Sequence, residues 1–172
     1  MIRRFVLASA ILIAAGSAAP AMAGTAIIDV EVTATVPVSC TISANPIAFS
    51  NYDPIGTHAT AGLYAPGSLI TTCTNGSAVV VTLSQGNNPE VSSTDAEPQR
   101  RLWNGISGDD NDFLSYEIYA GDGGTWGNTP DSSVTVSGTG QQVNTTIHAV
   151  IPPAQNVSSG NYTDTVTATI DF

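Results

Sequence analysis

The sequence contains no lysine, and four arginines are its only strongly basic residues. Against them stand 14 acidic residues, so the formal net charge of the 172-residue chain is −10. Proteins that bind nucleic acid need clustered lysine and arginine to neutralise phosphates. The composition therefore excludes nucleic acid as a partner. With 42% apolar residues, the chain is still hydrophobic enough to build the packed core of one domain.

Histidine is also scarce, and the common catalytic motifs are missing. His58 and His148 are the only histidines, 90 positions apart, and neither has a metal-ligand partner at a suitable spacing. We expect each to be exposed or hydrogen-bonded within the fold. No Gly-x-Ser-x-Gly sequence marks a serine nucleophile. The sequence therefore predicts no enzymatic function and no cofactor.

Two local features of the sequence could indicate a bound ligand. The acidic cluster at residues 109–112 partly matches a calcium loop, but an EF-hand needs Gly at its sixth position and Glu at its twelfth. Counted from Asp110, those positions hold Ser115 and Gly121, so a solvated loop is favoured over a calcium site. Trp103 and Trp126 could stack on sugar rings, although burial in the core is the favoured interpretation.

Residues 1–23 have the features of a secretory signal peptide. Two arginines at positions 3 and 4 precede an apolar run over 5–15, and Ala21-Met22-Ala23 offers small residues for cleavage after Ala23. A membrane anchor is the less favoured alternative, because spanning a bilayer takes about 20 apolar residues. The exported chain would start at Gly24 and keep two arginines and 14 acids, a net charge of −12.

Cysteine occurs only twice, at Cys40 and Cys73. An even number of cysteines in an exported chain predicts a disulfide. A redox or metal role would need a CxxC motif or nearby histidines, and the sequence has neither. The predicted bond closes a loop of 32 residues. It would stabilise the fold by roughly 3–4 kcal/mol through its restriction of the unfolded chain.

After the predicted signal peptide, no segment carries a sustained apolar repeat at helical spacing. Short runs rich in Val, Ile, Thr and aromatics alternate with clusters of Gly, Pro, Asn and Asp, a pattern typical of strands and turns. We predict internal strands near residues 38–43, 68–73, 78–84, 99–104, 113–119, 133–137 and 142–151. With one strand at each end, about nine strands predict a single all-β domain, a two-sheet antiparallel sandwich.

The clearest alternation of apolar and polar residues lies at the two ends. In residues 26–36 the even positions are apolar, and the odd positions from 29 onward are Asp, Glu, Thr and Thr. In residues 162–172, apolar side chains alternate with Thr and Asp. A period of two places one kind of side chain on each face of a strand. Both segments are therefore predicted strands with one face against an apolar surface.

Nine short motifs follow one another in a specific order along the chain. They are Cys40–Ser43, Ile47–Asp53, Thr71–Gly76, Val79–Gly86, Arg101–Leu102, Leu114–Tyr119, Trp126–Gly127, Ile151–Gln155 and Gly160–Val166. Each is weak alone, but their order and the placement of the cysteines resemble the spore coat protein U domain. That domain defines the subunit family of archaic chaperone–usher pili.

The resemblance implies an immunoglobulin-like β-sandwich of pilin type, which lacks its last strand and is completed by a donor strand. Residues 24–36 would be the donor strand, and residues 37–172 would form the sandwich with an acceptor groove beside the C-terminal strand. The side chains that fill the groove would be Ile28, Val30, Val32, Ala34 and Val36. The implied partners are neighbouring subunits in a head-to-tail polymer, a periplasmic chaperone and an outer-membrane usher.

We therefore expect a structural subunit of a bacterial surface pilus, exported through the periplasm, assembled by donor-strand exchange and supporting adhesion and biofilm formation. Its single domain favours a shaft or adaptor position over the tip. Two alternatives stay open. A self-contained secreted sandwich that binds carbohydrate would fold residues 24–36 back on itself and remain a monomer. A spore or cell-coat structural protein would use the same polymerising chemistry.

Overall fold

The computed structural model describes residues 22–106, 109–121 and 123–172. The chain divides into two units, residues 1–35 and residues 36–172. In the first unit, residues 22–35 form no strand and are exposed throughout. The predicted signal peptide lies outside the described residues except for its last two positions.

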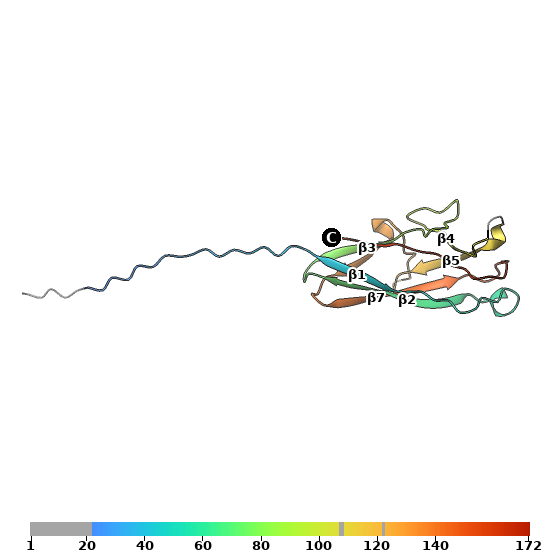
Figure 1. Cartoon of the computed structure of the whole chain (residues 1–172), viewed down its shortest axis with the longest axis horizontal. Coiled ribbons are helices and arrows are strands. Elements are labelled where there is room, and N and C mark those ends of the chain that lie inside the picture. The colour runs from blue at the N-terminus through green and yellow to red at the C-terminus, as the bar shows by residue number, and fades with distance from the viewer. Residues whose placement is uncertain (1–21, 107–108, 122) are drawn as a thin grey trace, which may run out of the picture. The chain divides into compact units, whose positions relative to one another are not determined.

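The second unit is a sandwich of two antiparallel sheets (Figure 1). The larger sheet has the order β1-β2-β7-β5-β4, and the smaller has the order β6-β3-β8. The strands are β1 (Cys40–Asn45), β2 (Leu63–Cys73), β3 (Ala78–Leu83), β4 (Arg100–Trp103), β5 (Phe113–Tyr119), β6 (Val134–Ser137), β7 (Gln142–Ile151) and β8 (Ala168–Asp171). Short 3-10 helices at Thr57–Ala59, Asp110–Asp112 and Pro130–Ser132 lie in the connections. This architecture confirms the predicted all-β antiparallel sandwich.

The core lies between the sheets and follows the alternation of the strands. In β5, Leu114, Tyr116 and Ile118 are buried, while Ser115 between them is exposed. Trp126 is fully buried and donates a hydrogen bond of 2.9 Å from its Nε1 to the carbonyl of Val81. The core interpretation of Trp126 is therefore correct, and a sugar-stacking role for this side chain is wrong.

The internal strands match the prediction closely, with one longer than expected. β2 begins at Leu63, five residues before the predicted start, and runs through Pro66 and Gly67. These two residue types suggested a turn. β1 pairs only with residues 68–73 of β2, so the earlier part of β2 is a sheet edge, where proline is tolerated.

The two alternating end segments differ from the prediction. Residues 162–167 are not part of a regular strand, and only residues 168–171 form β8. The reason is that this stretch passes from the edge of one sheet to the other. Residues 26–36 form no strand either. A strand needs a neighbour for its backbone hydrogen bonds, which alternation alone does not supply.

Among the described residues, none of the helices has the length and apolar character needed to cross a membrane.

Candidate functional site

Each sheet ends in a strand with one free edge. In the described residues, β8 pairs only with β3, and β1 pairs only with β2. The other edge of each strand therefore presents unpaired N–H and C=O groups. Such an edge is a template on which another extended segment can form a ladder.

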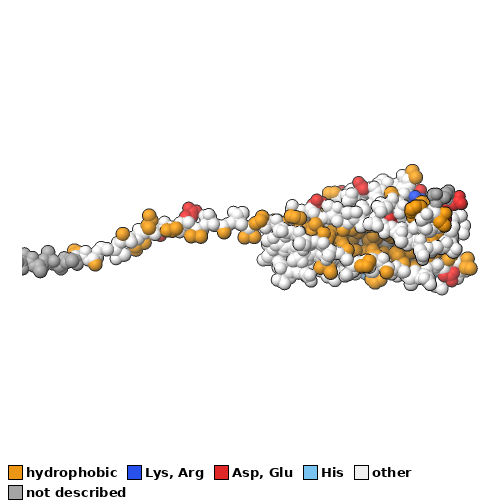
Figure 2. Space-filling model, in the orientation of Figure 1, with side chains coloured by type: hydrophobic (Ala, Val, Ile, Leu, Met, Phe, Trp, Pro, Cys, Tyr) orange, Lys and Arg blue, Asp and Glu red, His pale blue; other side chains and the backbone are white. Residues whose placement is uncertain are grey.

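An apolar groove of about 300 Å³ opens between these two edges. One wall is the stretch from the end of β1 to Phe49, and the other is the C-terminal segment from Asp164 to Ala168. The floor consists of core side chains from both sheets: Leu69, Leu83, Leu102, Tyr116, Ile118 and Ile147. Figure 2 shows hydrophobic side chains gathered along a hollow on the face where β1 lies. Apart from the half-buried Leu102, the floor side chains are only 2–4% exposed, so the groove runs along the margin of the core between the two strand edges.

A second cavity, of about 390 Å³, lies over β4 and β5 and is lined mainly by polar residues. Its principal charged groups are already used: Arg101 Nη1 pairs with Glu90 Oε2 at 2.7 Å, and the Arg101 guanidinium lies 4.2 Å from the centre of the Phe113 ring. The apolar groove is the better candidate site, because it lies between two free strand edges.

One end of the groove is polar. The ring of Phe49 packs edge-on against Tyr116, with 6.3 Å between ring centres, and the Tyr116 hydroxyl donates to Asp164 Oδ2 at 2.7 Å. Burial, together with the hydrogen bond to Asp164, raises the pKa of Tyr116 well above its ordinary value. The phenol therefore stays protonated and keeps donating across the physiological pH range.

Arg100 reinforces this end of the core from β4. Its side chain is 1% exposed and donates from Nε to the Ser84 carbonyl at 2.9 Å. Nη2 donates to the carbonyls of Leu83 and Trp126, at 3.2 and 2.7 Å. Burial lowers the pKa of Arg100. These bonds tie the end of β3 to the larger sheet, beside the groove.

The proposed donor residues carry unusually exposed apolar side chains. The exposed fraction is 86% for Ile28, 79% for Val30, 89% for Val32 and 79% for Val36, and Ala34 is exposed as well. Their alternation would place these five on one face of an extended strand. The segment has the pattern of a half-buried strand but no buried face of its own.

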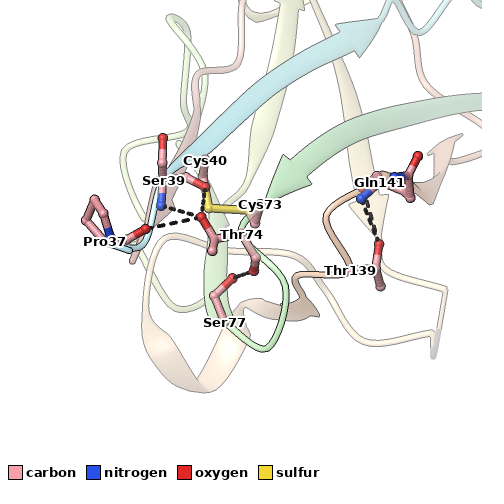
Figure 3. Close-up of a disulfide and its surroundings, with 8 residues drawn as sticks. All are labelled: Pro37, Ser39, Cys40, Cys73, Thr74, Ser77, Thr139 and Gln141. Carbon is pink, nitrogen blue, oxygen red and sulfur yellow. Dashed lines mark hydrogen bonds between the residues drawn. A yellow bond between two sulfur atoms is a disulfide. The ribbon is translucent and has the colours of Figure 1, made fainter. Parts of the chain in front are cut away.

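The disulfide between Cys40 and Cys73 follows this segment in the chain and joins β1 to β2 (Figure 3). The two cysteines are direct partners in the register of β1 and β2. Beside them, Ser39 N–H donates to Thr74 Oγ1 at 3.0 Å, and that hydroxyl contacts the carbonyl of Pro37 at 3.4 Å. The disulfide prediction is confirmed, and these contacts join Pro37, Ser39 and Cys40 to Cys73 and Thr74.

The other candidates from the sequence are the two histidines and the acidic cluster at residues 109–112. His58 stacks on Tyr52, with 5.0 Å between ring centres, and its Nδ1 accepts the Asp53 N–H at 2.8 Å. His148 is exposed on β7. In the acidic cluster, Asp112 is buried and accepts a hydrogen bond of 2.9 Å from Asn104. Within the described residues, no three His, Cys, Asp or Glu side chains are grouped as metal ligands would be.

The family resemblance implied a groove beside the C-terminal strand, but sequence reasoning did not identify Asp164 or the residues that form the two groove walls. Asp164 stands at a position where the alternation of residues 162–172 calls for an apolar side chain. That single acid on the apolar face was the signal in the sequence. The walls could not be found the same way, because each combines residues from an irregular stretch with residues from a strand.

Comparisons with known proteins agree with this architecture. The family model of the Spore Coat Protein U domain matches residues 26–169. "Protein U" of Myxococcus xanthus is 39% identical over an alignment of 161 positions, and the match covers 89% of this chain and 88% of that protein.

The fold is similar to one in the crystal structure of the CsuC-CsuE chaperone-tip adhesion subunit pre-assembly complex from archaic chaperone-usher Csu pili of Acinetobacter baumannii. The TM-score is 0.54 at 24% identity, over 80% of this chain and 40% of the matched one. At this identity the likeness concerns the fold. The family match over most of the chain and the 39% identical relative show that the protein belongs to the Spore Coat Protein U domain family.

Proposed function

We propose that this protein is a structural subunit of a bacterial surface pilus, in which residues 24–36 of one copy fill the groove of the next. The observation that carries the proposal is an apolar groove between two free strand edges, in a chain that also exposes an alternating apolar segment. The junction would be strand addition, in which main-chain hydrogen bonds supply affinity and alternate side chains supply fit.

The energetics favour a long-lived junction. Burying an aliphatic side chain fully contributes about 1.5–3 kcal/mol, and the donor segment offers four large ones and Ala34. Each strand hydrogen bond adds roughly 0.5–1.5 kcal/mol. The register is strict, because a slip by one residue would place Asp29 and Glu31 in the apolar groove.

The geometry of the contact determines the type of assembly. A segment at one place on the chain would bind a groove at another, so the contact is heterologous and each copy is both donor and acceptor. Heterologous contacts that do not close a ring produce a filament. This supports a fibre rather than a closed oligomer.

Export and assembly complete the proposal. The signal peptide would send the chain to the periplasm, where a chaperone would cover the groove until an outer-membrane usher exchanges it for the next subunit. The likeness in fold to a subunit solved with its chaperone supports this route. With two arginines against 14 acids in residues 24–172, the subunit suits a chaperone with a basic binding face. On the cell surface, the pilus would support adhesion and biofilm formation.

A spore or cell-coat polymer is the second candidate function, supported by the family to which the chain belongs. It would use the same groove and the same segment. A monomeric carbohydrate-binding sandwich is less supported, because Trp126 is fully buried and cannot stack on a sugar.

The test is size-exclusion chromatography of residues 24–172 beside a protein that starts at Pro37, with and without a peptide of residues 24–36. We expect the longer protein to polymerise, and the shorter one to be a less stable monomer that the peptide stabilises. Two equally stable monomers that do not respond to the peptide would contradict the proposal.

A further inference from the structure

The C-terminal segment crosses from one sheet to the other on its way along the groove. At the start of the crossing, Thr163 and Trp103 exchange two backbone hydrogen bonds of 2.9 Å, which join the segment to β4 of the larger sheet. At its end, the Thr167 carbonyl accepts from Ser84 N–H at 2.9 Å, and β8 then pairs with β3 of the smaller sheet. Residues 164–166 therefore bridge the two sheets.

The side chain of Asp164 holds this crossing in place through hydrogen bonds. Its Oδ1 accepts the backbone N–H of Asn87 at 2.8 Å and the Asn88 side-chain amide at 3.3 Å. Its Oδ2 accepts the Tyr116 hydroxyl at 2.7 Å. One carboxylate thus joins the C-terminal wall to the loop after β3 and to the floor of the groove.

The neighbouring backbone is shaped to admit this carboxylate. Gly86 has a φ of +83°, in the left-handed region that favours glycine. A Cβ at that position would lie 2.2 Å from Asp164 Oδ2. The loop therefore closes tightly over Asp164, and the carboxylate is an integral part of the wall.

An apolar groove tends to close, and the hydrogen bonds of Asp164 oppose this closure. Thr165 and Val166 follow Asp164 directly and line the groove, and no strand in the described part of the chain pairs with the outer edge of β8. Apolar surface exposed to water favours collapse. Backbone hydrogen bonds hold the two ends of the wall at Thr163 and Thr167. Without a restraint between these ends, residues 164–166 would move inward over the floor and narrow the space that a donor must enter.

We infer that Asp164 is a positioning residue that holds the C-terminal wall in place, so that the groove is open before the donor arrives. This inference rests on the proposed function, since it describes how the same groove is kept ready. A receptor that occupies its competent state only part of the time binds with an affinity reduced by that fraction. Removing the restraint should therefore weaken donor binding and slow its association.

The test uses residues 24–172 carrying Val32→Asp as the acceptor, because that change disables its own donor segment and leaves the groove intact. The probe is a fluorescent peptide of residues 24–36, with binding and association rate followed by anisotropy. Asp164→Ala, Asp164→Asn and Tyr116→Phe are compared with the matched control Asp131→Ala, which removes an exposed acid from the 3-10 helix Pro130–Ser132.

Asp164→Ala should bind the peptide about tenfold more weakly, with a slower association rate, as expected if the open wall falls to about a tenth of the population. Asp164→Asn should stay within about twofold of the parent, since the amide can accept from the Asn87–Asn88 loop and donate to the Tyr116 hydroxyl. This rescue separates a positioning role from a role of charge. Tyr116→Phe, which keeps the ring packing against Phe49, should weaken binding about threefold.

Equal peptide affinity for Asp164→Ala and Asp131→Ala would overturn the inference while leaving the proposed function standing. If Asp164→Ala does not fold, Tyr116→Phe decides, and parental affinity in that variant would overturn the inference. Failure of the Val32→Asp parent itself to bind the peptide would overturn the proposed function, and the inference with it.

Discussion

At the residue scale, Val32 lies in the middle of the alternating segment and is 89% exposed. In the proposed junction its side chain enters an apolar groove, where an aspartate would be buried without a partner. Such burial costs several kcal/mol. We therefore expect Val32→Asp to abolish polymerisation of residues 24–172, as measured by light scattering, while chaperone binding is largely retained.

Thr33→Asp provides the matched control, since it adds the same charge on the opposite face of the strand. That variant should still polymerise. Fibres from the Val32→Asp protein would mean that residues 24–36 are not the donor.

Tyr116 and Tyr119 make the stability of the folded protein depend on pH in alkaline solution. Burial raises the pKa of Tyr116, and the hydrogen bond to Glu117 raises the pKa of Tyr119 to about 12 from an ordinary 10.0. The unfolded chain loses these phenol protons first, so the contribution to stability is complete below pH 10 and falls as the pH rises toward 12. Urea unfolding at a series of pH values should show this decline.

The slope of that decline separates the two tyrosines. Tyr116→Phe removes one titrating group, so its stability should fall less steeply between pH 10 and 12 than that of the parent. Identical slopes would mean that Tyr116 does not resist ionisation in the folded protein.

At the scale of elements, the disulfide joins β1 to β2 shortly after the proposed donor segment in the chain, and the end of β1 forms part of one wall of the groove. Replacing both cysteines with serine should cost about 2–5 kcal/mol of unfolding free energy. Thermal melting of the variant and of the reduced parent should give the same loss. A double variant as stable as the oxidised parent would contradict this role.

The elements also show how far sequence reasoning reaches. β5 and β7 were predicted to the residue, because their alternation is bounded by clear turn formers. The early part of β2 was missed because Pro66 and Gly67 indicate a turn, although an edge position tolerates them. Alternation identifies the apolar face of residues 26–36 but not the surface it contacts, so the strand was predicted without its partner.

The crossing of the C-terminal segment shows a different limit. Residues 162–172 keep a two-residue period although the segment leaves one sheet and joins the other at Ser84. A local pattern cannot report which neighbour is present at each step. Asp164, the one departure from the period, marks the crossing in the sequence.

At the scale of the whole molecule, the scarcity of basic residues predicts resistance to trypsin. Residues 24–172 contain only Arg100 and Arg101 as cleavage sites. Arg100 is 1% exposed, and the Arg101 side chain is 15% exposed and paired with Glu90. Because both lie in β4, we expect the native protein to remain intact while the urea-unfolded protein is cut at this pair.

Gel electrophoresis of a digestion time course would follow this directly. Cleavage of the native protein as fast as the unfolded one would mean that β4 opens readily, contrary to the hydrogen bonds that hold Arg100.

The proposed assembly would have a polarity that no single variant reveals, because each copy would be both donor and acceptor. Val32→Asp disables the donor and spares the groove, whereas Val166→Glu places a charge on the groove wall and spares the donor. Multi-angle light scattering of the two proteins, alone and mixed, tests head-to-tail exchange most directly. Head-to-tail exchange predicts monomers from each protein alone and a 1:1 dimer from the mixture; monomers in the mixture, or fibres from either protein alone, would contradict it.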